Sequence, residues 1–299
     1  MYQIVTDSSW DMGEERAKSL GVAVVPFYVT CDGETYYSED NDKVVRDMYQ
    51  FMVDNPKKFP KTSQPSAEVY TETFRKYASQ GIDIICFTLS AKFTGSFNVA
   101  SIAAENVMEE FPGVRIRVMD STLATVMQGL MIQEMVRFQR SGADYDAFCS
   151  RAEEIKETAH IFFTVGNLDY LVHGGRIGKV AGLSANILNL RPMILMQKGE
   201  LFPMGLARGR KQSLKKAMEK IIEYVNESGK TPDSFAYIVG YGYDPEEGEK
   251  LRTDFLAKIK EIWPEFSEKM NVDIGQIGAT IGVHTGPWPI GFGLIDRSF

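Results

Sequence analysis

The stretch Ile82-Asp83-Ile84-Ile85-Cys86-Phe87-Thr88-Leu89-Ser90 is an apolar run that ends in hydroxyl side chains, and Thr94-Gly95-Ser96 and a helical pattern over 97–110 follow it. β-branched and aromatic residues between turn signals predict a buried strand that turns into a helix. The first N–H groups of a helix lack partners within the helix and can hold a phosphate or a carboxylate. The stretch therefore predicts an α/β unit with an anion site at its turn, although these residues serve equally well as a plain N-cap.

Two further segments carry the same small hydroxyl residues. Thr6-Asp7-Ser8-Ser9 follows an apolar run at 2–5, and Lys61-Thr62-Ser63-Gln64-Pro65-Ser66 precedes a helical pattern. Asp7 is a candidate base or metal ligand at a strand end, but an Asp at such a position is more often the N-cap of the next helix. Thr62 is either a turn residue or a second hydroxyl for the anion.

Apolar runs alternate with helical patterns over the first half of the chain. Strands are expected at 2–5, 22–29, 82–89 and 114–119, and helices at 42–53, 66–79, 97–110, 125–140 and 145–159. This alternation predicts βαβ units and a largely parallel, Rossmann-like sheet. Ligands of such sheets bind beyond the carboxyl ends of the strands, so Asp7, Ser90 and Ser121 are expected to converge on one crevice.

The composition changes near His160. We predict a boundary there between an N-terminal α/β domain at 1–159 and a C-terminal α+β domain at 160–299, because 299 residues exceed a typical single domain. In the second region, strands are expected at 161–165, 187–196, 235–241 and 274–283, and helices at 211–227 and 246–262.

The net charge and the cysteine pattern argue against several classes of protein. A formal net charge of −7 argues against a nucleic-acid partner, which would call for a basic face. The three cysteines, Cys31, Cys86 and Cys149, are scattered, which fits reduced thiols better than disulfides or a metal site. With neither a secretory signal nor a long apolar span, the expected location is the cytoplasm.

Several catalytic motifs are nearly present but incomplete. Gly174-Gly175-Arg176-Ile177-Gly178-Lys179 resembles a P-loop, but His173 replaces the first glycine and Val180 replaces the magnesium-binding Ser or Thr. No dinucleotide-binding glycine pattern follows the first strand, and no zinc pattern occurs. We therefore predict no catalytic residue, no metal and no cofactor in this chain.

Two positions outside these segments also attract attention. His284 lies in Val283-His284-Thr285-Gly286-Pro287, an expected strand end followed by a turn, where a lone histidine is more often structural. Arg208 opens the basic cluster Arg208-Gly209-Arg210-Lys211, which is either a solvated face or a contact for an anion or a partner.

In order and spacing, these motifs resemble the DegV family over essentially the whole chain. The motifs are Thr6-Asp7-Ser8, Lys61-Thr62-Ser63-Gln64-Pro65-Ser66, Ser90 through Thr94-Gly95-Ser96, Asp120-Ser121, His173-Gly174-Gly175-Arg176-Ile177, Ile187-Leu188-Asn189-Leu190-Arg191-Pro192 and Val283-His284-Thr285-Gly286-Pro287. The resemblance implies a two-domain α/β fold that holds a long-chain fatty acid between its domains. It also implies that a dihydroxyacetone-kinase-like fatty acid kinase subunit is the partner.

The same resemblance implies a set of site residues. Those expected around the fatty acid carboxylate are Thr62, Thr94, Gly95, Ser96 and His284, with Arg208 nearby as a partner or phosphoryl contact. The family's Ser-Gly-Thr is Thr94-Gly95-Ser96 in this chain, which keeps both hydroxyls. The family's His-x-Gly-Pro-Gly ends here in Trp288, which is expected to add bulk near the headgroup and to affect acyl preference.

The physical chemistry of a fatty acid suits such a site. Burying about fifteen methylenes contributes on the order of 12 kcal/mol gross. Charge-assisted hydrogen bonds of about 1.5–3 kcal/mol each must offset the desolvation of the carboxylate. The residues that we expect to line the acyl tunnel are Phe162, Ile187, Leu188, Leu190 and Ile194.

The expected role is that of a carrier. The protein would take a fatty acid from a membrane surface and present its carboxylate to the kinase, which would form an acyl phosphate. Two alternatives stay open at this point: a small-molecule phosphotransfer enzyme or hydrolase that uses Asp7, and a lipid-binding protein that has no kinase partner.

Overall fold

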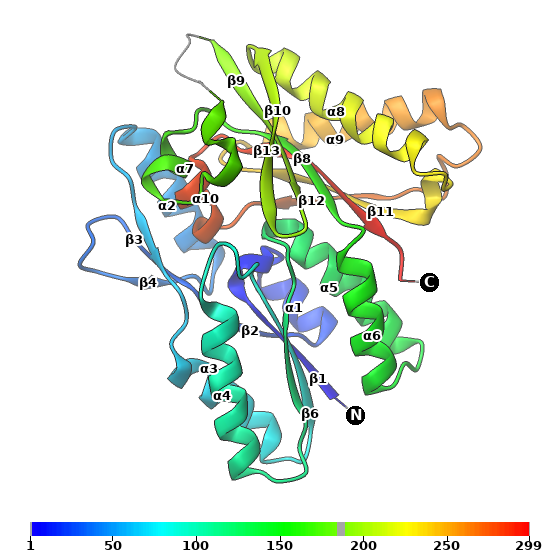
Figure 1. Ribbon diagram of the computed structural model, residues 1–299. Helices are drawn as coiled ribbons and strands as arrows, with labels where there is room; N and C mark the ends of the chain where they lie inside the picture. Colours follow the sequence, from blue (N-terminus) through cyan, green and yellow to red (C-terminus); the bar gives the residue numbers. More distant parts are fainter. Residues whose placement is uncertain (1, 184–188, 299) are drawn as a thin grey trace.

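Three β-sheets organise the part of the chain that the computed structural model describes, residues 2–183 and 189–298 (Figure 1). One sheet is parallel throughout, with the order β2-β1-β6-β7. Its strands are β1 (Tyr2–Asp7), β2 (Ala23–Val25), β6 (Asp83–Thr88) and β7 (Ile116–Asp120). The predicted α/β class, with a parallel sheet in the first half of the chain, is confirmed.

The second large sheet has six strands in the order β10-β9-β8-β13-β11-β12. They are β8 (His160–Thr164), β9 (Leu190–Gln197), β10 (Glu200–Arg208), β11 (Phe235–Tyr241), β12 (Val272–Gln276) and β13 (Ile290–Asp296). Neighbouring strands are antiparallel except β11 and β12, so this sheet is mixed. All its strands come from residue 160 onward, while the domain boundary at 159/160 stays a prediction.

Helices connect and cover these sheets. They are α1 (Gly13–Leu20), α2 (Asp42–Asp54), α3 (Ala67–Ala78), α4 (Ser96–Glu110), α5 (Thr125–Arg140), α6 (Tyr145–Lys156), α7 (Asp169–His173), α8 (Arg210–Glu227), α9 (Pro245–Ile262) and α10 (Ala279–Thr285), with short 3₁₀ helices η1 (Ser8–Trp10), η2 (Gly178–Gly182) and η3 (Pro232–Ser234). The longer helices begin and end within a few residues of the predicted bounds, except that α6 stops at Lys156. The short α1, α7 and α10 were not predicted.

Helix α5 packs against both large sheets. Eleven of its sixteen residues are buried, which is typical of a helix that has apolar neighbours on all sides. Its Met127 and Met131 belong to one apolar cluster together with Ile4 of β1 and Ile238 of β11. The core therefore runs through α5 from the parallel sheet to the mixed sheet.

The third sheet is small and antiparallel, with the order β4-β3-β5, and consists of β3 (Tyr28–Thr30), β4 (Tyr37–Ser38) and β5 (Lys61–Ser63). The strand predicted at 22–29 divides at Pro26 into β2 and β3, because proline has no N–H to continue a ladder. This sheet places β5 against α10.

The strand predicted at 274–283 is wrong beyond Gln276, since α10 begins at Ala279. The first turn of α10 is capped by Glu39, which comes from a distant segment. Glu39 Oε1 accepts a hydrogen bond from the Thr280 N–H at 3.0 Å, and Glu39 Oε2 accepts one from the Thr280 hydroxyl. A carboxylate stabilises a helix N-terminus by satisfying its unpaired N–H groups. Glu39 is separated from Thr280 by 241 positions in the sequence, so no local sequence pattern indicates the helix.

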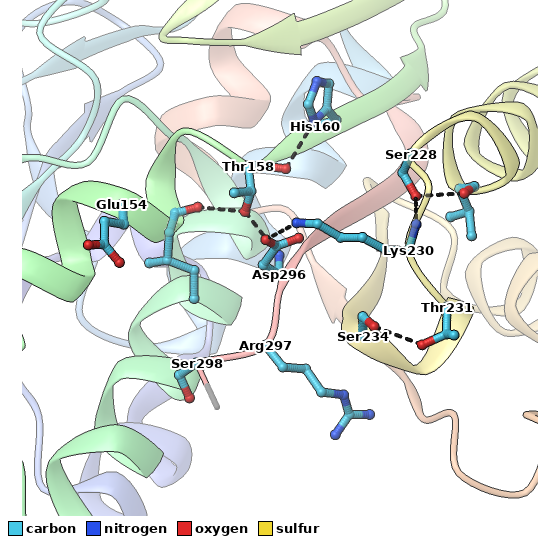
Figure 2. A network of polar contacts seen from close by, with 12 residues as sticks. Glu154, Thr158, His160, Ser228, Lys230, Thr231, Ser234, Asp296, Arg297 and Ser298 are labelled. Carbon is cyan, nitrogen blue, oxygen red and sulfur yellow. Dashed lines mark hydrogen bonds and ion pairs between the residues drawn. The ribbon is translucent and has the colours of Figure 1, made fainter.

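The residues at the end of β13 fasten the mixed sheet to α5 and to the end of α6, as Figure 2 shows in part. The Asp296 N–H donates to Thr158 Oγ1 at 3.0 Å, and the Asp296 carboxylate pairs with Lys230. The Ser298 N–H donates to the buried Glu134 of α5 at 3.0 Å. These contacts tie β13, which lines the cavity described below, to the α5–α6 pair.

Candidate ligand-binding cavity

A cavity of about 340 Å³ lies between the mixed sheet, α5, α10 and the loops that follow β5 and β6. Its volume is within the range of about 300–1,000 Å³ that is typical of small-molecule sites. The lining residues are Phe27, Thr62, Ser63, Gln64, Leu89, Phe93, Thr94, Ala124, Thr125, Val126, Met127, Ile161, Phe163, Leu171, Arg176, Met196, Leu201, Gly240, Ile277, Thr280, Ile281, His284, Thr285, Pro289, Gly291, Phe292 and Gly293. The wall is mainly apolar.

One end of the cavity is polar. Thr62 Oγ1 of β5 and His284 Nε2 of α10 are hydrogen-bonded at 2.9 Å. The Thr94 hydroxyl donates to Gln64 Oε1 at 2.9 Å. Arg176 joins them on the wall, and among the described lining residues it is the one with a permanent charge. We call Thr62, Gln64, Thr94, Arg176 and His284 the polar end.

His284 is neutral at physiological pH. Burial of the ring and the positive charge of Arg176 lower the pKa of His284 to about 4. Its Nδ1 atom is enclosed and has no hydrogen-bond partner. A neutral imidazole supplies one N–H donor. Because Nδ1 is enclosed, the ring nitrogen that lies toward the polar end is Nε2, which is hydrogen-bonded to Thr62, and Arg176 supplies the charge.

Glycine places Arg176 and His284 side by side. A Cβ atom at Gly174 would lie against His284 Nδ1, closer than non-bonded atoms approach. The following Gly175 has a φ of +69°, a left-handed conformation that favours glycine. The chain then delivers Arg176, whose Nε donates to the Phe93 carbonyl at 3.0 Å. The incomplete P-loop motif is thus a tight turn that places Arg176 on the cavity wall.

The five residues predicted around a carboxylate fall into two groups. Thr62, Thr94 and His284 line the cavity. Ser96 is fully buried behind Thr94, with the two hydroxyl oxygens 3.0 Å apart. Gly95 precedes α4, and a Cβ at this position would come within 3.1 Å of Gln64 Oε1. Ser96 and Gly95 therefore position Thr94 and Gln64 from behind.

The residues expected to form the acyl tunnel lie mostly beside the cavity. Phe162 does not line it, because its side chain points to the opposite face of the sheet and packs in the apolar cluster with α8 and α9. Its strand neighbours Ile161 and Phe163 line the cavity instead, as the alternation of a β-strand requires. Ile194 is buried in the apolar cluster that contains Phe163, without lining the cavity.

The remaining tunnel candidates and Arg208 are placed as follows. Leu190 and Arg208 face each other at the ends of β9 and β10, and neither lines the cavity. Ile187 and Leu188 lie outside the described residues. Arg208 is exposed, so a contact with a partner remains a prediction for it.

Trp288 lies outside the cavity lining. It is 39% exposed and packs edge-on against Tyr243, with ring centroids 5.5 Å apart. The bulk that distinguishes this chain from the family pattern therefore faces a neighbouring surface, and it does not reach the polar end.

Asp7, at the end of β1, hydrogen-bonds to the residue that follows β6 and to α5. Its Oδ2 accepts the Leu89 N–H at 2.7 Å, and its Oδ1 accepts from Ser9 Oγ at 2.6 Å and from Gln128 Nε2 at 3.0 Å. Asp7 occupies the N-cap position of η1, as expected, but its side chain makes no cap hydrogen bond to that helix. Burial raises the pKa of Asp7 to about 6.

The Ser121 hydroxyl donates to Gln128 Oε1 at 3.5 Å, and the Ser90 hydroxyl donates to the Gly199 carbonyl at 3.2 Å. None of Asp7, Ser90 and Ser121 lines the cavity, so these three residues do not form the predicted ligand crevice.

Two observations complete the chemical description of the described residues. Among residues 2–183 and 189–298, no three or more His, Cys, Asp and Glu side chains gather in a way that could hold a metal ion. In the same part of the chain, no helix has the length and apolar character needed to cross a membrane.

A mostly apolar cavity with one polar end, built into an α/β fold, has the character of a site for a small amphipathic molecule. The chain belongs to the DegV family, whose model matches residues 1–297. The resemblance inferred from the motifs is thereby confirmed.

Solved structures and curated relatives support this assignment over the full length. A stearic acid-binding protein from Eubacterium ventriosum is 39% identical, with a TM-score of 0.90 and coverage of 100% of this chain and 99% of that one. A fatty-acid-binding DegV family protein from Thermus thermophilus is 28% identical, with a TM-score of 0.83 and 99% of each chain covered. A fatty acid-binding protein from Thermotoga maritima is 29% identical over 98% of this chain and 96% of its own length.

Proposed function

We propose that this protein binds a long-chain fatty acid, with the acyl tail inside the cavity and the carboxylate at the polar end. The observation that carries the proposal is the distribution of polar groups on the cavity wall. Arg176, the one charged residue among the described lining residues, lies with the hydroxyls of Thr62 and Thr94 and the ring of His284 on a wall that is mainly apolar. The ligands named for the relatives from Eubacterium ventriosum and Thermus thermophilus support it.

The polar end holds enough donors for a carboxylate. Arg176 supplies a charged donor, the neutral His284 ring supplies one N–H, and the hydroxyls of Thr62 and Thr94 can each turn from their present partners toward a ligand. Hydrogen bonds to a charged group contribute about 1.5–3 kcal/mol each. Three or four such bonds offset a desolvation cost of several kcal/mol.

We further propose that the bound fatty acid is presented to a separate, dihydroxyacetone-kinase-like subunit that phosphorylates its carboxylate. The family resemblance suggests this step, and the exposure of Arg176 supports it, because Arg176 lines the cavity and also reaches the surface. A carboxylate beside Arg176 would thus be accessible from outside while its tail stays enclosed. In this proposal Arg208 contacts the kinase, and a membrane surface supplies the fatty acid transiently.

The first test is mass spectrometry of the purified protein after denaturation. We expect a long-chain fatty acid to be released in about equimolar amount, since about fifteen buried methylenes give slow dissociation. The ligand-free protein should then bind a fluorescent fatty acid that an unlabelled fatty acid displaces, and Arg176→Ala should weaken that binding. A released nucleotide, or the absence of fatty acid binding after ligand removal, would contradict the proposal.

The second test separates the carrier from its alternatives. With ATP and a fatty acid kinase subunit encoded in the same genome, the loaded protein should yield an acyl phosphate, and Arg208→Ala should slow this reaction without loss of fatty acid affinity. ATP turnover by this protein alone, abolished by Asp7→Asn, would instead indicate an enzyme. Fatty acid binding with no phosphate transfer would indicate a lipid-binding protein without a kinase partner.

A further inference from the structure

The side of the mixed sheet that faces α5 and α10 lacks side chains at three adjacent positions. Gly291 and Gly293 lie two residues apart on β13 and so share a face, and Gly240 of β11 pairs directly with Gly291. All three line the cavity. We call Gly240, Gly291 and Gly293 the glycine face.

Two side chains of α5 cover the glycine face. A Cβ atom at Gly293 would lie 2.5 Å from Met127 Sδ, and one at Gly240 would lie 3.0 Å from Val126 Cγ2. Met127 is fully buried, and Val126 is nearly so. At these two points, therefore, the space left by the missing side chains is already filled from the opposite side.

The glycine face and the polar end lie at opposite ends of α10. Ile277, just before the helix, approaches Gly240, with its Cγ1 atom 3.5 Å from the position of a Cβ there. His284 occupies the last turn of the same helix and belongs to the polar end. A ligand whose carboxylate lay beside His284 would therefore have Val126 and Met127 at the far end of the cavity from its headgroup.

We propose that Met127 and Val126, seated on the glycine face, form the end wall of the acyl channel and determine the chain length that the protein prefers. This inference rests on the proposed fatty acid binding. Met127 is suited to the position because its unbranched thioether adapts to irregular spaces. The absence of side chains on the glycine face deepens the cavity, and the side chains of Val126 and Met127 determine how much of that depth the acyl tail can occupy.

Substitutions from the two sides should shift the preference in opposite directions. Met127→Ala removes three heavy atoms from the end wall, so the preferred saturated acid should lengthen by about two carbons, with a gain of about ten-fold for the longer acid relative to the parent preference. Gly293→Ala adds a methyl group from the sheet and displaces the flexible Met127 side chain into the channel. It should shift the preference toward shorter acids.

The experiment measures displacement of a fluorescent fatty acid by myristic, palmitic, stearic and arachidic acids from ligand-free protein. Met135→Ala is the matched control, because Met135 lies on the same helix and is fully buried in the same apolar cluster without lining the cavity. It should lower stability but leave the order of the four acids unchanged. Thr94→Val, at the polar end, should weaken binding of all four acids by a similar factor.

The possible results of this experiment distinguish the proposed end wall from the proposed fatty acid binding. Opposite shifts in Met127→Ala and Gly293→Ala, with an unchanged order in Met135→Ala, would support the end wall. An unchanged order in both variants, while the parent protein binds fatty acids, would overturn the end wall and leave the proposed function intact. If Met127→Ala does not fold, Gly293→Ala alone decides. If the parent binds none of the four acids, the proposed function itself fails.

Discussion

The two faces of the mixed sheet differ in the side chains that the same strands present to them. On β13, Phe292 and its neighbours at alternate positions pack against the layer formed by α8 and α9, in a cluster with Phe235 and Val239 of β11. The intervening positions, Gly291 and Gly293, face α5 and have no side chain at all. The face toward α8 and α9 thus carries large apolar side chains, whereas the face toward α5 has glycines where the cavity lies. The following predictions test this division.

Phe292→Ala should have the largest effect, and that effect should be on stability. Phe292 is 1% exposed and packs against Phe255 with centroids 4.8 Å apart. Truncation should lower the free energy of unfolding by about 3–5 kcal/mol, through lost burial and the cavity left behind. Urea denaturation of the ligand-free protein measures this. A loss below about 1 kcal/mol would show that the outer face does not carry the stability assigned to it.

Thr94→Val should affect binding and leave stability almost unchanged. The substitution keeps the shape of the side chain but removes the hydroxyl that hydrogen-bonds Gln64 and Ser96 at the polar end. We expect fatty acid affinity to fall by about 1–3 kcal/mol. A fluorescent fatty acid displacement assay beside a urea titration separates the two quantities. Equal affinity of variant and parent would remove Thr94 from the carboxylate site.

The polar end should also contribute a pH dependence of smaller size. Because the pKa of His284 falls from 6.5 to about 4 on folding, the unfolded chain binds more protons between these values. The contribution of His284 is therefore complete above pH 6.5 and is lost as the pH falls toward 4. Relative to His284→Gln, the parent should lose about 1–2 kcal/mol over this range, after allowance for solvent at the partly buried ring.

This comparison must be made between variants, since Asp7 acts in the opposite direction. Its pKa rises from 3.8 to about 6 on folding, so its contribution is present below 3.8 and is lost as the pH rises through 6. Urea denaturation of the parent and of His284→Gln at a series of pH values cancels the Asp7 contribution. A constant difference between the two proteins would mean that the folded His284 ring titrates near its ordinary pKa.

Trp288→Ala should have the smallest effect. The side chain packs on Tyr243 outside the cavity lining, so fatty acid affinity and acyl preference should each change by less than about 0.5 kcal/mol. The displacement assay with the four saturated acids checks both. A clear shift in acyl preference would mean that Trp288 reaches the headgroup when a ligand is bound.

Local patterns predict much of this molecule, and the failures share one cause. The parallel strands and the long helices follow from hydrophobic periodicity. The motif resemblance indicated Thr62, Thr94 and His284, and all three line the cavity, while their contact with a carboxylate stays a prediction. The helical state of residues 279–285 depends on a cap from Glu39, which no local window contains. The sequence indicated Phe162, whereas Phe163 lines the cavity, because an apolar run does not show which of two alternating sets of side chains faces which side of the sheet.

Two further features of the cavity have a sequence signal of their own. Gln64 and Arg176 lie inside quoted motifs, yet their side chains were given no role. The segment 290–294 alternates large apolar residues with glycine, Ile-Gly-Phe-Gly-Leu. A strand with this composition has one bare face, which indicates either a close approach of another backbone or a hollow. Applied at the outset, that pattern would have predicted both β13 and the floor of the cavity.

The cap that Glu39 places on α10 has a consequence for any attempt to divide the protein. The helix that carries His284 takes its N-terminal partner from the β4 region, and His284 itself hydrogen-bonds Thr62 of β5. A fragment that begins at residue 160 would therefore lack Glu39 and Thr62, and a fragment that ends at residue 159 would lack His284. Ligand affinity should consequently reappear only on mixing the two fragments, which makes fatty acid uptake a sensor of fragment complementation.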